Sequence, residues 1–157
     1  MRQDGTIMAN RVTKSLLALF VLFVAIQIVR PARTNPPVDP AQTLEAHVEV
    51  PPNVEAILTR SCADCHSNRT QWPWYSNIAP VSWLLTSDVN EGRRHLNFSD
   101  WEHRHQHEES PFDEMCKQTR DGDMPPWYYR PLHPESRLTA TDIETLCGWT
   151  ASGPKER

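Results

Sequence analysis

The sequence predicts an all-α fold with long irregular connections, preceded by one N-terminal transmembrane helix. Four segments after residue 52 place apolar residues at helical spacing. No segment shows the alternation typical of a strand. Fourteen prolines among 157 residues exceed the usual share of about 5%, which indicates many turns and extended connections. The length suits one small domain with appendages, since domains commonly have about 100 to 200 residues.

A short basic N-terminus, 1–14, precedes the apolar run SLLALFVLFVAIQIV, 15–29. As a helix, this run rises about 22 Å, which is short of the roughly 30 Å hydrocarbon core of a bilayer. Lys14 and Arg30 flank the run and can extend the span by snorkelling. No small-residue cleavage site follows it, so we expect an uncleaved transmembrane anchor over 15–30 in preference to a cleaved signal sequence.

The next segment, 31–52, contains six prolines. Such a chain favours the extended polyproline II conformation, at about 3.1 Å per residue. We therefore expect a semi-rigid linker that holds the C-terminal domain, 53–157, away from a membrane surface.

The first two helices of this domain are expected between clear start and stop signals. Asn53 is a fair N-cap for an apolar face that continues to Cys65. Pro80 suits the first turn of a second helix, whose apolar face continues to Gly92.

Two more helices follow in the C-terminal part. The third is expected to begin after the N-cap Ser110 and to stop at Gly122. The fourth is expected to begin with a capping box formed by Thr141 and Glu144.

The motif CADCH places Cys62, Cys65 and His66 at the end of the first expected helix. A Cys-x-x-Cys pair can bind zinc, but a structural zinc site needs four ligands, and no second pair has comparable spacing. A thioredoxin-like redox pair would lie in a βαβ frame, which the sequence lacks. A histidine directly after the second cysteine is the attachment signature of a c-type haem, in which the thiols bond to the porphyrin edge and the imidazole ligates iron. One covalent haem c is therefore the preferred interpretation, with zinc binding and thiol redox chemistry as alternatives.

The sixth iron ligand decides the kind of chemistry. Met124 is favoured, because it stands in a proline-stiffened loop after a helix stop and on no apolar helix face. His133 is the main competitor. A thioether beside the His66 imidazole gives a closed electron-transfer centre with a raised potential, whereas an empty position permits peroxide or gas chemistry.

Aromatic and polar residues near these motifs could line a haem pocket or pair with the propionates. Each alone is equally well explained as an ordinary core or surface residue. These candidates are Trp72, Trp74, Tyr75, Arg93, Trp127 and Tyr128.

Two further groups of residues have metal or disulfide chemistry available. Cys116 and Cys147 could form a disulfide in an oxidising compartment, or they could be two buried thiols on helix faces. His103, His105 and His107 alternate with polar residues and are more typical of a solvated face than of a metal site.

The charge pattern excludes one class of partner. The formal net charge is −4 and no basic tract is present, so nucleic acid is not an expected partner. No Ser-His-Asp ordering, phosphate loop or carboxylate pair supports hydrolysis or phosphoryl transfer. Any catalysis would belong to the haem, and an enzyme is less expected than an electron carrier.

Several motifs in a fixed order, CADCHS, WPWY, GRRHLNFSDW and MPPWYYRPLHP, resemble the bacterial haem-binding domain family over about residues 45–152. The resemblance implies a cytochrome c-like helical domain, with thioether bonds at Cys62 and Cys65, His66 as the proximal ligand and Met124 as the distal one. Members are similar to periplasmic or membrane-tethered cytochromes, which implies that the C-terminal domain lies outside the bacterial inner membrane.

The expected function is thus that of a membrane-anchored periplasmic monohaem cytochrome that passes single electrons between a protein donor and a protein acceptor. The alternative is a peroxidase-associated protein or a gas or redox sensor with an open or displaceable sixth ligand.

Overall fold

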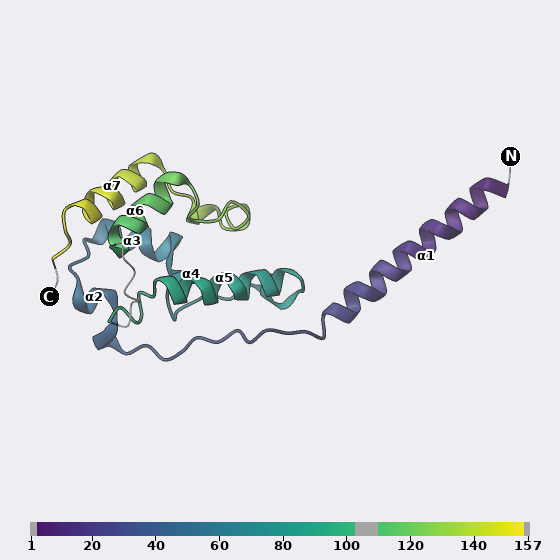
Figure 1. Ribbon diagram of the computed structural model, residues 1–157, viewed down its shortest axis with the longest axis horizontal. Helices are drawn as coiled ribbons and strands as arrows, with labels where there is room; N and C mark the ends of the chain where they lie inside the picture. Colours follow the sequence, from purple (N-terminus) through teal and green to yellow (C-terminus); the bar gives the residue numbers. More distant parts are fainter. Residues whose placement is uncertain (1–2, 103–109, 156–157) are drawn as a thin grey trace. The chain divides into compact units, whose positions relative to one another are not determined.

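The computed structural model describes residues 3–102 and 110–155. Over these ranges it contains seven α-helices, three short 3-10 helices and no strand, so the expected all-helical fold is confirmed (Figure 1). The chain divides into two compact units. The first unit comprises residues 1–33 and 72–87, and the second comprises residues 34–71 and 88–157.

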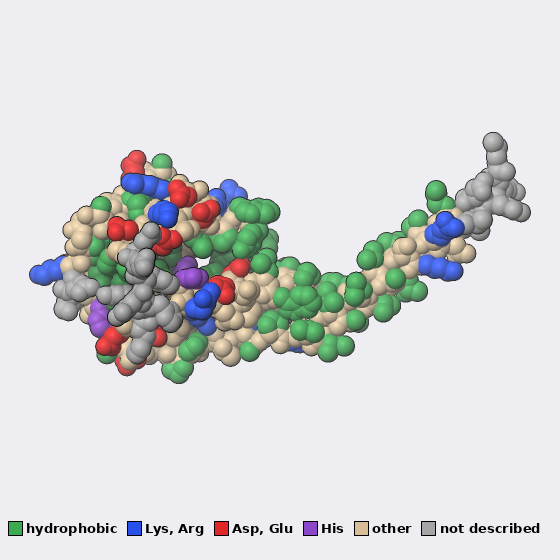
Figure 2. Space-filling view, in the orientation of Figure 1, with side chains coloured by type: hydrophobic (Ala, Val, Ile, Leu, Met, Phe, Trp, Pro, Cys, Tyr) green, Lys and Arg blue, Asp and Glu red, His purple; other side chains and the backbone are tan. Residues whose placement is uncertain are grey.

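The first unit contains the long helix α1 (Gln3–Ile26), which begins before the predicted apolar segment and ends within it. Eight large apolar side chains of α1, between Leu16 and Val24, are 45% to 63% exposed, and Figure 2 shows them along the helix surface. No helix in the described ranges is both long enough and apolar enough to cross a membrane. The prediction of a transmembrane helix over 15–30 therefore has no support from the structure.

Hydrogen bonds join the chain after α1 to the remainder of the first unit. The side-chain amide of Gln27 donates to the carbonyl of Ala79 at 3.1 Å and accepts from the amide of Ala79 at 2.9 Å. The indole of Trp83 donates to the carbonyl of Val29 at 2.8 Å. These contacts hold residues 27–29 beside the start of α5 (Val81–His95).

The predicted proline-rich linker is only partly a linker. The 3-10 helix η1 (Pro40–Gln42) and the short helix α2 (Leu44–His47) lie within it. Leu44 and Val48 are 1% and 0% exposed and belong to the core of the second unit. Two apolar residues among prolines and polar residues give no periodic signal. The contribution of Leu44 and Val48 to the core could therefore not be predicted from the sequence.

The first predicted helix is two helices in the structure. α3 (Pro52–Ser61) starts after Pro51, which takes the N-cap position expected for Asn53. α4 (Ala63–His66) follows after a break at Cys62, whose φ of −126° is not helical. The CADCH motif therefore forms a separate turn instead of ending one continuous helix.

The later helices follow the prediction more closely. α5 continues through Gly92, where a stop was expected, to His95. α6 (Pro111–Asp121) has Ser110 as N-cap and Gly122 as C-cap, both as predicted, and the φ of Gly122 is 79°, a left-handed value that suits glycine.

The capping box of α7 (Ala140–Ala151) is shifted by two residues from the expected one. Thr139 and Asp142 form it instead of Thr141 and Glu144. The Thr139 amide donates to a carboxylate oxygen of Asp142 at 2.8 Å, and the Asp142 amide donates to the Thr139 hydroxyl at 3.1 Å. Both threonines precede an acidic residue by three positions, so the sequence alone did not distinguish them.

The core of the second unit lies among α2, α3, α6, α7 and the segment that follows α5. Phe112 packs edge-on against Trp149, with ring centroids 5.4 Å apart. The buried core residues are Leu44, Val48, Val54, Leu58, Phe98, Trp101, Met115, Leu146 and Trp149.

A disulfide between Cys116 and Cys147 joins α6 to α7, which lie side by side in Figure 1. Of the two alternatives for these cysteines, buried thiols or a disulfide, the structure has the disulfide. The bond links residues 31 positions apart and so restricts the unfolded chain.

Removal of this disulfide is expected to lower the free energy of unfolding by about 3 to 4 kcal/mol, the loop-entropy value for this separation. Urea unfolding of Cys116→Ala/Cys147→Ala beside the wild type measures it. The corresponding double serine variant serves as a control, because a loss shared by both reports the bond and not the substituent. Equal stability of the wild type and both variants would contradict the expectation.

Candidate functional site

The CADCH turn presents three reactive side chains on one short element. Cys62 lies between α3 and α4, and Cys65 and His66 belong to α4. The amides of Cys65 and His66 donate to the Cys62 carbonyl at 3.2 and 2.9 Å, which closes the turn. Both cysteines are free thiols, and all three side chains are partly exposed.

The imidazole of His66 has a fixed orientation. Its Nδ1 lies 3.0 Å from the carbonyl oxygen of Leu96, and because a carbonyl only accepts, this bond places the hydrogen on Nδ1. Nε2 is then the nitrogen with a lone pair for a metal. Burial lowers the pKa of His66, so the ring is neutral at pH 7, as metal binding requires.

The two thiols of the turn are not poised for disulfide exchange. Burial raises the pKa of Cys62 and of Cys65 to about 12, and for Cys65 the nearby carboxylates of Asp88 and Asp64 add to this effect. A redox-active cysteine needs a lowered pKa, because the thiolate is the nucleophile. The site therefore argues against the thiol redox alternative.

The zinc alternative requires further ligands close to the CADCH turn. Among the residues that the structure describes, no group of three or more His, Cys, Asp or Glu side chains is arranged to hold a metal ion. His103, His105 and His107 lie outside those residues.

Helix α5 lies in direct backbone contact with the turn at Gly92. A Cβ atom built at Gly92 would be 2.7 Å from the carbonyl oxygen of Cys65, closer than real Cβ atoms approach. Only glycine permits this approach, and it brings the end of α5, including Leu96, to the imidazole of His66. The sequence-based prediction placed a helix stop at Gly92. An isolated glycine within a helical pattern can also indicate close packing.

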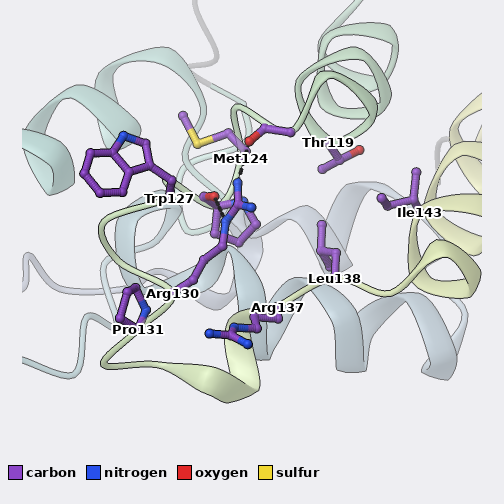
Figure 3. Close-up of a pocket in the computed structure, with 10 residues that line it drawn as sticks. Thr119, Met124, Trp127, Arg130, Pro131, Arg137, Leu138 and Ile143 are labelled. Atoms are coloured by element: carbon purple, nitrogen blue, oxygen red, sulfur yellow. Dashed lines mark hydrogen bonds between the residues drawn. The ribbon is translucent and has the colours of Figure 1, made fainter.

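Met124 follows the left-handed cap of α6 and is 38% exposed. Its amide donates to the carbonyl of Gln118 at 3.1 Å. It borders a cavity of about 410 Å³, and Figure 3 shows its thioether directed away from Leu138 and Ile143 on the opposite side. Cys62, Cys65 and His66 do not line this cavity. This cavity therefore does not join Met124 to the CADCH turn.

Two tyrosines nevertheless attach the loop after Met124 to the elements of the turn. The hydroxyl of Tyr129 donates to Asp64, which lies between the two cysteines, at 2.8 Å. The hydroxyl of Tyr128 donates to Asp88 of α5 at 3.2 Å. The loop that carries the predicted distal ligand is therefore bonded to both α4 and α5. Sequence reasoning missed Asp64 and Tyr129, because only the fold brings them together.

Arg93 has a structural role different from the one considered for it. Its Nε donates to the Ser67 carbonyl at 2.8 Å, and Nη1 donates to the Thr34 carbonyl at 2.8 Å. Its Nη2 donates to Asn35 at 2.9 Å and to Thr70 at 2.8 Å. All three nitrogens thus hold the chain segments around the CADCH turn, and a further role of Arg93 at a haem propionate stays a prediction.

The remaining candidate aromatic residues divide between the two units. Trp72, Trp74 and Tyr75 belong to the first unit, where Trp74 is 76% exposed and packs edge-on against Tyr75. In the second unit, Trp127 is also 76% exposed and packs edge-on against Tyr128. A role of these residues in a haem pocket stays a prediction.

His133, the competitor of Met124, is engaged within its own loop. Its ring stacks on Tyr129 with the centroids 3.9 Å apart and the planes 4° from parallel. Its Nδ1 lies 3.2 Å from a carboxylate oxygen of Glu135. These contacts do not decide between Met124 and His133, so the choice of the iron ligand stays a prediction.

A helical unit with two free thiols and an oriented, neutral imidazole on one turn defines a haem-binding class of protein. Comparison with family models agrees, since the haem-binding domain model matches residues 21–152. The chain belongs to the haem-binding domain family, as its motifs predict. No curated protein and no solved structure gives a significant match.

Proposed function

We propose that this haem-binding protein is a membrane-anchored, periplasmic cytochrome with one covalent haem c, and that it transfers single electrons through an iron ligated by His66 and Met124. The observation that carries the proposal is the hydrogen bond from Nδ1 of His66 to the Leu96 carbonyl, which leaves the lone pair on Nε2, in the same motif as two free thiols. A thiol redox site has no need of an oriented imidazole, and a structural zinc site needs four ligands.

Cys62 and Cys65 would hold the haem. Each S–H would add across one vinyl group, with sulfur on one vinyl carbon and hydrogen on the other, without net oxidation. A bound haem would supply the one-electron chemistry, and the protein would set its potential and orientation. The Leu96 carbonyl holds the ring of His66 and would increase its basicity as a ligand. The thioether of Met124 would be the second protein ligand and would raise the potential.

Membrane anchoring through α1 is part of the proposal. The large apolar side chains between Leu16 and Val24 are exposed, and a helix with such a surface needs apolar cover. The Cys116–Cys147 disulfide favours an oxidising compartment such as the periplasm. An electron donor in the membrane and a soluble acceptor are the partners that fit this placement.

Cell fractionation tests the anchoring. The full-length protein should sediment with membranes and be released by detergent but not by high salt, because its attachment is apolar. Recovery in the soluble fraction would contradict the anchor. That result would leave the haem chemistry of the second unit unaffected.

One observation favours a second candidate function. Met124 is partly exposed, and the cavity that it borders is not lined by Cys62, Cys65 or His66. A haem whose sixth position is open or easily vacated would bind peroxide or a diatomic gas, and the protein would be a sensor or a peroxidase-associated protein.

Carbon monoxide distinguishes the two functions. Added to the reduced wild-type protein, it should bind little or slowly if the Met124 thioether occupies the sixth position. Immediate stoichiometric binding would overturn the closed electron-transfer site and support the sensor function.

A further inference from the structure

The guanidinium of Arg130 bonds to the backbone on both sides of Met124. Its Nε donates to the carbonyl of Pro125 at 2.6 Å, and its Nη2 donates to the carbonyl of Gly122 at 2.5 Å. Pro125 follows Met124 directly, and Gly122 precedes it by two residues. Figure 3 shows Arg130 reaching toward this short segment from the far side of the loop.

The chemistry of the segment leaves few other ways to fix it. Pro125 and Pro126 have no N–H, so this part of the loop can be held only through its carbonyls. On the other side of Met124, the amides of Asp123 and Met124 both donate to the Gln118 carbonyl, at 3.0 and 3.1 Å. The backbone around Met124 is thus fixed by α6 through its amides and by Arg130 through its carbonyls.

A single planar group suits this task. A guanidinium presents several donors in a rigid fork, and hydrogen bonds from a charged donor are stronger than neutral ones. Tyr129, the residue before Arg130, is bonded to Asp64 of the CADCH turn at 2.8 Å. Two consecutive residues therefore connect the segment that carries the thioether to the turn that carries the thiols.

We propose that Arg130 is a positioning residue that fixes Met124 for ligation of the haem iron. The inference rests on the proposed function, in which Met124 is the sixth ligand. Without the guanidinium, the segment between Gly122 and Pro125 loses its carbonyl partners, and the thioether leaves the iron for part of the time.

The test compares Arg130→Gln and Arg130→Lys with Arg137→Gln in the full-length haem protein. Arg137 lines the same cavity and is exposed, and within the described part of the chain its guanidinium forms no hydrogen bond, so it controls for loss of a positive charge there. Lysine keeps the charge of Arg130 but has no planar fork. It also provides a second variant if the glutamine variant does not fold.

Three readouts are measured: the charge-transfer band between methionine and ferric iron, carbon monoxide binding by the reduced protein, and hydrogen exchange of a peptide covering 122–132. Both Arg130 variants should lose most of the band and bind carbon monoxide readily. Amide exchange in the peptide should rise on the order of tenfold or more, because each of the two lost charged hydrogen bonds has an effect of about this size. Arg137→Gln should resemble the wild type in all three.

The possible failures can be distinguished. A wild-type protein with covalent haem but no methionine band would overturn Met124 ligation, and the positioning role with it. A wild-type protein with the band, together with Arg130 variants that keep both the band and slow exchange, would overturn the positioning role alone.

Discussion

Replacement of Met124 by alanine should abolish the methionine-to-iron charge-transfer band and open the sixth position of the haem. The reduced variant should then bind carbon monoxide at once. We expect its reduction potential to fall by on the order of 100 mV, a modest part of the roughly 0.8 V range that axial ligands set. Loss of the thioether is the cause, because a soft sulfur ligand favours the reduced iron.

The matched control for this variant is Met115→Leu. Met115 is 7% exposed in the core of the second unit, on the same helix that leads to Met124. A leucine of similar volume should cost less than about 1.5 kcal/mol and leave the spectrum unchanged. A Met124→Ala variant that keeps the band and the potential of the wild type would exclude Met124 as the ligand and renew the case for His133.

Replacement of Gly92 by alanine should both destabilise the second unit and impair haem incorporation. The added Cβ would lie 2.7 Å from the Cys65 carbonyl oxygen, and backbone atoms on both sides must move to relieve this clash. Overpacking of this kind costs about 1 to 3 kcal/mol. Because the end of α5 also carries Leu96, the same movement would disturb the orientation of His66.

Gly148→Ala is the control for the helix effect. Gly148 lies in α7, is exposed, and an added Cβ there meets nothing within 4 Å. Alanine should stabilise this position by about 0.4 to 1 kcal/mol, since it restricts the unfolded chain. Urea unfolding and the haem content of the two purified variants measure both effects. Equal stability and equal haem content of Gly92→Ala and Gly148→Ala would contradict the close contact.

The parts of the site that could be predicted from the sequence are those formed by residues close together in the chain. Cys62, Cys65 and His66 lie within five consecutive residues, so their common role can be predicted from spacing alone. The ends of α6 at Ser110 and Gly122 are equally local, since a cap depends on its own backbone conformation.

The parts that it did not predict depend on contacts between distant residues. Tyr129 and Asp64 are 65 positions apart, and neither belongs to a motif that indicates the other. Arg93 offered several possible partners, and only the fold shows that its donors bond to segments on both sides of the CADCH turn. The burial of Leu44 could not be predicted for the same reason. Most of the core residues around it lie later in the chain.

The central claim, that Cys62 and Cys65 hold one haem covalently, is tested most directly by the mass and the visible spectrum of the purified protein produced with cytochrome c maturation machinery. The proposed function predicts the mass of the chain plus one haem, which acidified organic solvent does not extract. Cys62→Ala/Cys65→Ala should lose this haem, whereas Cys116→Ala/Cys147→Ala should keep it. A colourless wild-type protein, or a haem that the solvent removes, would contradict the account.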